Sequence, residues 1–60
     1  MKWKLEIIDW NVPNAQIMGY DVQLFCTLSE VWDHIGFRLN KHRFGYAGLR
    51  NNIEYRLTRW

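Results

Sequence analysis

The sequence predicts a small α+β protein of ββαββ order, with a four-stranded, mainly antiparallel sheet and one helix packed on one face. Three patterns lead to this fold class. Apolar and polar residues alternate in two segments near the N-terminus, apolar residues recur at helical spacing in the middle, and an Asn-Asn pair joins two further segments near the C-terminus. A chain of 60 residues has room for one domain, which we assign to residues 1–60.

Two segments with a period of two open the chain and predict a pair of strands. Residues 2–10 alternate between apolar and polar side chains, and residues 16–26 do the same. The short link between them contains the turn formers Asn11, Pro13 and Asn14, so we expect the strands to form a hairpin. In this phase the inward-facing side chains include those of Trp3, Leu5, Val22 and Leu24.

The next segment combines a start signal with an amphipathic repeat, and both predict a helix. Thr27 and Glu30 stand at the spacing of a capping box, in which the threonine hydroxyl accepts a hydrogen bond from the Glu30 backbone N–H. Asn40 is the expected end of this helix. The apolar stripe expected to face the sheet consists of Leu28, Val31, Trp32, Ile35 and Leu39.

The C-terminal third predicts a second hairpin. Asn51 and Asn52 tolerate the positive φ of a type I′ turn, which pairs residues 43–50 with residues 53–60. An alternative makes residues 41–50 a short helix, which their two glycines disfavour. The hairpin register sets Tyr46 opposite Leu57, Gly48 opposite Tyr55, Phe44 opposite Arg59 and Arg50 opposite Ile53. Its inner face then collects Phe44, Tyr46, Ile53, Tyr55 and Leu57.

Composition excludes several classes of protein. Hydrophobic residues make up 48% of the chain and charged residues 23%, which is too apolar for a disordered tail. One cysteine, Cys26, and two histidines supply neither a disulfide nor the four ligands of a zinc site. Charges interrupt the N-terminal apolar run, unlike a signal peptide, and no run has the length of a membrane span. We therefore expect a cytoplasmic protein without membrane contact, metal or cofactor.

The predicted sheet face away from the helix carries more large apolar side chains than a solvent-exposed sheet face normally does. An antiparallel sheet covered on one side normally exposes polar residues on the other. The candidate binding residues on this face are Trp10, Phe25, Trp60, Arg43 and Arg56. Trp60, Arg43 and Arg56 form the expected anchor cluster, because Arg43 lies opposite Trp60 in the hairpin register. Two alternatives are a strand phase shifted by one residue, and a Trp60 side chain that folds back over the sheet.

The outer side of the helix carries one further candidate, Phe37. It lies opposite the inward stripe in the predicted helix, so its ring is expected in solvent. We interpret it as a second contact point or as the seam of a homodimer, with an isolated surface residue as the alternative.

Charge divides the chain into an acidic and a basic part. Residues 1–37 carry a net charge of −3, and residues 38–60 carry +5, with Arg supplying five of six cations. The guanidinium group binds carboxylates and phosphates through paired hydrogen bonds. The basic part is therefore either a solvated surface or a contact for an acidic protein or a nucleic-acid backbone.

These patterns predict a non-enzymatic protein-binding module. Glu30, His34 and Arg38 share a helix face, but no nucleophile or metal set accompanies them, so we do not expect an enzyme. A chain this short and aromatic also suits an inhibitor or modulator of a host nucleic-acid-processing protein, of the kind that phages make. The alternative is direct nucleic-acid binding by a basic, aromatic sheet face.

Overall fold

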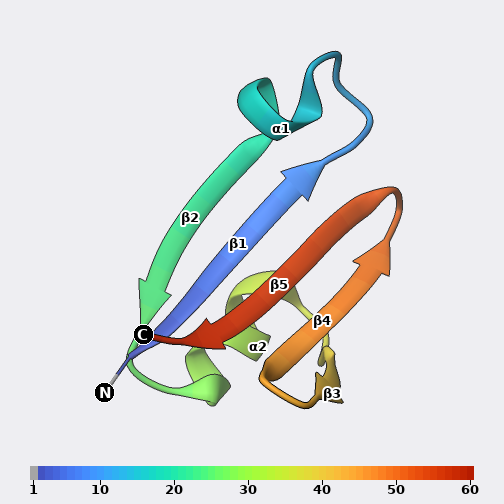
Figure 1. Ribbon diagram of the computed structural model, residues 1–60. Helices are drawn as coiled ribbons and strands as arrows, with labels where there is room; N and C mark the ends of the chain where they lie inside the picture. Colours follow the sequence, from blue (N-terminus) through green and yellow to red (C-terminus); the bar gives the residue numbers. More distant parts are fainter. Residues whose placement is uncertain (1) are drawn as a thin grey trace.

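The fold is an antiparallel sheet of five strands with two short helices, described over residues 2–60 of a computed structural model (Figure 1). The elements are β1 (Trp3–Asp9), α1 (Ala15–Met18), β2 (Tyr20–Phe25), α2 (Leu28–Ile35), β3 (Asn40–His42), β4 (Gly45–Arg50) and β5 (Ile53–Arg59). The predicted α+β class is confirmed. The prediction of four strands and one helix is wrong, because the link after β1 contains α1 and the segment after α2 forms β3.

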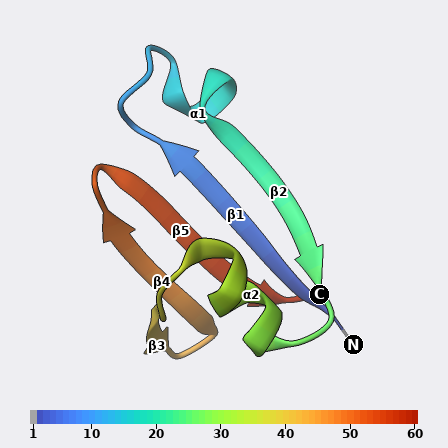
Figure 2. The same cartoon turned by 180° about the vertical axis from the view of Figure 1, so that it is seen from behind.

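The strands lie in the order β2-β1-β5-β4-β3, so the first and last strands of the sequence pair at the centre. This ladder continues past both strand ends, since the Trp10 N–H donates to the Asn52 carbonyl and the Trp60 N–H donates to the Lys2 carbonyl. α2 crosses one face of the sheet on the way from β2 at one edge to β3 at the other (Figure 2). Both termini lie at one end of the sheet and α1 lies at the other (Figure 1).

A small core fills the space between α2 and the sheet. Leu5, Val31 and Leu57 have no exposed surface. Half-buried aromatic rings surround them, and Tyr46 makes T-shaped contacts with both Trp3 and Trp32, with centroids 5.9 and 5.3 Å away. Eight residues predicted for the core are confirmed there: Trp3, Leu5, Val31, Trp32, Ile35, Leu39, Tyr55 and Leu57.

The strand β2 has the opposite phase to the predicted one. Val22 and Leu24, expected in the core, are exposed on the face away from α2. Phe25, expected on that open face, pairs with Trp3 and lies on the helix side, with its ring 5.2 Å from the ring of His34. Alternation specifies a period of two but not which face will be covered. Because β2 is an edge strand that leads directly into α2, the helix needs only the end residue, Phe25, as an apolar partner there.

The helix α2 ends earlier than predicted. Gly36, with φ of 85°, closes the helix in the left-handed conformation, and its N–H donates to the Trp32 carbonyl. The predicted end at Asn40 is wrong, because this conformation breaks the helical repeat four residues before it. The expectation that Phe37 faces solvent from the helix is also wrong. Its ring is half-buried and packs edge-on against Tyr55 at 5.1 Å.

Two local predictions are confirmed. The Glu30 N–H donates to the Thr27 hydroxyl oxygen at 3.2 Å, and that hydroxyl donates to the Glu30 carboxylate at 3.1 Å. Asn51 and Asn52 have φ of 53° and 63°, as a type I′ turn requires. The alternative helix over residues 41–50 is wrong. The predicted register is found in the pairs Tyr46–Leu57, Gly48–Tyr55 and Arg50–Ile53.

Candidate binding face

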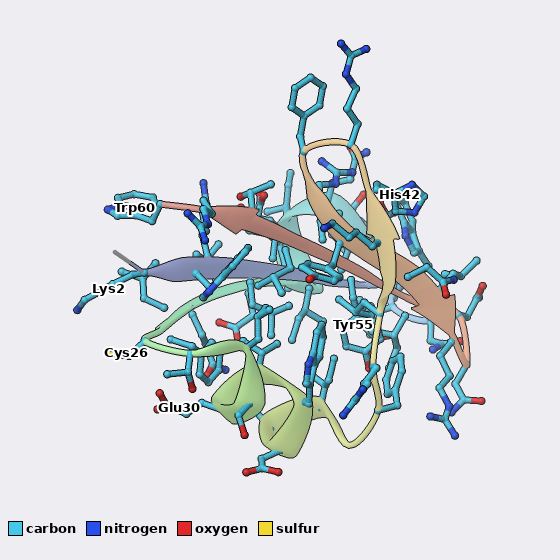
Figure 3. All side chains as sticks on the ribbon, turned by 90° about the horizontal axis from the view of Figure 1, so that it is seen from below. Lys2, Cys26, Glu30, His42, Tyr55 and Trp60 are labelled. Atoms are coloured by element: carbon cyan, nitrogen blue, oxygen red, sulfur yellow. The ribbon has the colours of Figure 1, made fainter. Side chains whose placement is uncertain are left out.

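The sheet face turned away from α2, called here the open face, is built from alternate residues of each strand. Figure 3 sets α2 below the sheet, with Tyr55 on the same side, and shows the opposite side above the sheet. Cross-strand pairing arranges the open-face side chains in three rows: Leu24, Lys4 and Thr58; Val22, Glu6, Arg56 and Ala47; Tyr20, Ile8, Glu54 and Leu49. The face is therefore largely charged at its centre and apolar at its two sides.

One side of the open face is a continuous strip of exposed apolar side chains. Tyr20, Val22 and Leu24, called here the β2 apolar row, are 42, 40 and 46% exposed. Ile17 and Met18 of α1, which precedes β2, are more exposed still. A solvated edge strand normally carries polar residues at such positions, so this strip is unusually apolar for an exposed sheet edge.

The centre of the open face is a network of hydrogen bonds between neighbouring strands. Glu54 accepts from the Trp10 indole N–H at 3.0 Å and from the Arg56 guanidinium at 2.8 Å. The Tyr20 hydroxyl donates to the Glu6 carboxylate at 2.7 Å. Both carboxylates of the open face are thus occupied by side chains of the same face.

This network changes how its members ionise. The hydrogen bonds from Arg56 and Trp10 hold the pKa of Glu54 below its ordinary value. The same contact with Glu54 raises the pKa of Arg56, and the hydrogen bond to Glu6 raises the pKa of Tyr20. At neutral pH the centre of the face therefore holds an ionised Glu54 carboxylate and a neutral Tyr20 hydroxyl.

The expected anchor cluster is not assembled as predicted. Trp60 is 68% exposed and lies beside Lys4, whose Nζ is 5.3 Å from the ring centroid. Arg43 lies in the turn between β3 and β4, with its guanidinium 5.4 Å from the centre of the Phe44 ring. The prediction that Arg43 faces Trp60 is wrong, because β4 begins two residues after Arg43. Arg43 and Arg56 do border one shallow hollow, and their role in binding stays a prediction.

The other predicted site residues fall on different faces. Trp10 lies on the open face beside Glu54, at the far end of β1 from Trp60. Phe25 and Phe37 lie on the helix side and pack against the core, so neither belongs to the open face.

Two strongly exposed side chains on the other side of the open face were not among the predicted site residues. Leu49 is 68% exposed, and Phe44, expected opposite Arg59 on the inner face, is 81% exposed in the β3–β4 turn. This turn rises above the sheet on the side opposite α2 (Figure 3). The usable signal in the sequence was Gly45, because a glycine inside a strand pattern often marks a close approach of two backbones. The structure has such an approach, since a Cβ at Gly45 would meet the backbone carbonyl of Leu57, and β4 begins at this residue.

One end of the molecule is basic. The termini and the β3–β4 turn share this end (Figure 1), and cations stack on aromatic rings there. The Arg59 guanidinium lies 5.1 Å from the centre of the Trp3 ring. A hollow brings Trp3, Lys41, Arg43 and Arg59 together. We define the basic end as Lys2, Lys4, Lys41, Arg43 and Arg59.

Comparison with protein-family models, curated proteins and solved structures finds no match for this chain. Over residues 2–60, no group of three or more His, Cys, Asp or Glu side chains is placed to hold a metal ion. In the same part of the chain, no helix has the length and apolar character needed to cross a membrane.

Proposed function

We propose that the protein is a small, non-enzymatic protein-binding module that docks its open face on a partner protein. One observation carries this proposal: the sheet face away from α2 exposes large apolar side chains on both sides of its charged centre. The β2 apolar row lines one side, Leu49 lies on the other, and Phe44 borders a hollow there with Ala47 and Arg56. Exposed apolar surface of this extent on a small protein is typical of an interface.

The two parts of the open face have different roles in this proposal. Leu49 and Phe44 are the anchors, because strongly exposed apolar side chains lose the most contact with water when a partner covers them. The network of Trp10, Glu54 and Arg56 is already hydrogen-bonded within the face. A partner can therefore cover it without leaving a buried charge unpaired. The apolar sides supply affinity and the central charges orient the partner.

The test is a comparison of open-face and helix-face variants in a binding assay. Tagged wild-type protein is cross-linked in nuclease-treated lysate, and the captured partner is then purified and titrated. We expect Phe44→Ser combined with Leu49→Asp to weaken binding by about a hundredfold or more. The matched control is Ser29→Ala with Asp33→Ala on the exposed side of α2, which should bind like wild type. Equal binding by both double variants would show that the open face is not the interface.

Direct nucleic-acid binding is a second candidate, and the basic end is the observation that favours it. Exposed Trp60 beside Lys4, and Phe44 beneath Arg43, combine a stacking surface with a cation, as single-strand binders do. Glu6 and Glu54 oppose this reading for the open face, since their carboxylates repel phosphate at its centre.

A gel-shift titration with single-stranded and duplex DNA and RNA separates the two candidates. A nucleic-acid binder loses affinity steeply between about 50 and 200 mM salt, and Lys4→Ala with Arg43→Ala reduces that slope. We expect no salt-sensitive shift, because we favour a protein partner. A steep shift that Lys4→Ala with Arg43→Ala flattens would replace the protein-binding proposal.

We also propose a narrower role, in which the bound partner is itself a nucleic-acid-processing protein that the module inhibits or modulates. The basic end supports this role, because it offers cations to the acidic or phosphate-bearing surface of such a machine. The activity of the purified partner is measured with increasing amounts of this protein. Unchanged activity at saturating binding would restrict the function to binding.

A further inference from the structure

We propose that two copies of this chain associate through the free edge of β2, antiparallel about a two-fold axis at Val22, and so join their sheets into one. This inference goes beyond the proposed function, because it concerns the edge of the sheet and not its open face. It rests on three features of β2: its outward backbone groups, its lack of protective residues, and the complementary side chains of Asp21 and Gln23.

The backbone of β2 presents a row of hydrogen-bonding groups outward. The Asp9 N–H donates to the Gly19 carbonyl at 2.8 Å, which shows that odd-numbered residues of β1 and β2 form the hydrogen-bonded pairs. Even-numbered residues of β1 bond instead to β5, as the Trp10 N–H bond to Asn52 shows. In β2 the N–H and C=O groups of the even-numbered residues therefore point away from the sheet. These residues are Tyr20, Val22 and Leu24, the same ones that form the β2 apolar row.

The two edges of the sheet are defended differently against pairing with another strand. β3 is only three residues long and has the polar sequence Asn40-Lys41-His42. Short length and lysine are the usual protections of an edge strand. β2 has six residues, Tyr20–Phe25, and contains no proline, glycine, lysine or arginine. The β2 edge is thus the one suited to pairing, and its only charge is Asp21.

That single charge selects both the partner and the register. With the axis at Val22, each Asp21 lies opposite the partner's Gln23, whose amide is a hydrogen-bond donor. Within one chain the Gln23 amide already donates to Asp21 at 3.0 Å, so the two side chains suit each other. An axis at Asp21 would oppose two carboxylates, and an axis at Gln23 would set Asp21 against the partner's Phe25. Of these three registers, only the one centred on Val22 gives each Asp21 a hydrogen-bond donor and also pairs the outward N–H and C=O groups of the two strands.

The dimer also enlarges the open face. A two-fold axis perpendicular to the sheet keeps both α2 helices on one side, so the two β2 apolar rows meet on the other side. Val22 lies against the partner's Val22, and Tyr20 lies opposite the partner's Leu24. An edge contact of six residues is smaller than a standard interface of about 1,600 Å², so we expect a Kd on the order of 100 μM.

Sedimentation velocity of the purified chain from about 10 μM to about 1 mM tests the association. We expect the mass to rise from 7.4 kDa toward twice that value. Val22→Lys places two ammonium groups at the axis and should weaken the dimer about tenfold or more. The matched control Leu49→Lys makes the same charge change at a more exposed site on β4 and should dimerise like wild type. Circular dichroism confirms that both variants fold.

Two further measurements test the register. Gln23→Lys sets an ammonium group opposite the partner's Asp21 and should tighten the dimer about threefold, whereas an axis at Gln23 would make it weaker. Amide exchange should slow with concentration at Tyr20, Val22 and Leu24 but stay constant at Gln23, whose N–H is bonded within the chain.

The following results would overturn the proposed dimer. A wild-type monomer at every concentration, or a dimer that Val22→Lys leaves intact, shows that β2 does not pair with a second copy. A monomer whose partner capture is lost with Val22→Lys shows that β2 contacts the partner protein and not a second copy of this chain. The proposed function is judged separately, because Leu49→Lys should abolish partner capture while leaving the dimer unchanged.

Discussion

At the scale of single residues, Glu54 connects side chains of three neighbouring strands on the open face, β1, β4 and β5. It lies on β5, accepts hydrogen bonds from Trp10 and Arg56, and pairs across the ladder with Ile8 and Leu49. Both hydrogen bonds favour the ionised carboxylate, which is why the pKa of Glu54 lies below its ordinary value of 4.5.

The lowered pKa of Glu54 predicts a stability difference that depends on pH. A carboxyl group with a depressed pKa stabilises the fold above its ordinary pKa, and this contribution is lost as pH falls through the folded-state value. Because the ion pair is largely exposed, we expect Glu54→Gln to lower the free energy of unfolding by less than about 1 kcal/mol at neutral pH. Urea unfolding should show the difference vanish in acid. Asp33→Asn on α2 is the control, and an equal pH-dependent loss there would refute the assignment.

Gly45 supplies a second prediction at this scale. A Cβ at this position would meet the backbone carbonyl of Leu57, so Gly45→Ala must push β4 away from β5. We expect a loss of about 2 kcal/mol or more in the free energy of unfolding. Gly36→Ala has no atom within 4 Å of its Cβ and should lose only about 1 kcal/mol, from its left-handed φ of 85°. A larger loss at Gly36 than at Gly45, measured in urea, would contradict this reading.

At the scale of elements, α2 is a short helix whose ends matter as much as its interior. It spans eight residues, Leu28–Ile35, between the Thr27 cap and Gly36. Isolated helices of this length are unstable in water, so capping and contact with the sheet must hold it. Of its residues, Val31 is fully buried.

The cap of α2 therefore makes a measurable contribution. Thr27→Ala removes the oxygen that accepts from the Glu30 N–H, and we expect the free energy of unfolding to fall by about 1 kcal/mol. Ser29→Ala, an exposed change in the first turn, should stay within about 0.5 kcal/mol of wild type. Urea unfolding followed by circular dichroism compares them. A loss no larger for Thr27→Ala than for Ser29→Ala would show that the cap is not needed.

At the scale of the whole molecule, stability depends on a core in which few side chains are fully buried. A domain of 60 residues buries a smaller share of its surface than larger domains do, so its margin of stability is small. Leu5 and Leu57 are opposite each other on the central pair β1–β5, and both are fully buried. The strands that form the centre thus come from opposite ends of the sequence.

Truncation of a central side chain should consequently unfold the protein. Leu57→Ala is expected to lower the free energy of unfolding by about 2–5 kcal/mol, which is comparable with the total for so small a domain. Leu49→Ala makes the same substitution on the adjacent strand at a side chain that is mostly exposed, and it should stay folded. Thermal melts of both variants test this. A folded Leu57→Ala variant with an unchanged melting temperature would mean that the core lies elsewhere.

The features that the sequence determined by itself are local. The Thr27 cap and the Asn51-Asn52 turn were predicted correctly, because capping and turn chemistry involve residues only a few positions apart. Once the turn is placed, reflection about it sets the β4–β5 register. The general α+β class and the open-face positions of Trp10 and Arg56 were also predictable, since they follow from period and local register.

Tertiary structure alone decided which faces are covered and which strands meet. The pairing of β1 with β5 joins the ends of the sequence, and no local signal specifies a contact at that separation. The phase of β2 depended on where α2 lies over the sheet, so Val22 and Leu24 emerged on the open face and Phe25 did not. Gly36 likewise redirected Phe37 onto Tyr55. The alternating apolar pattern of β2 fits either face of the sheet. Only the packing of α2 against one side determines which of its side chains are buried.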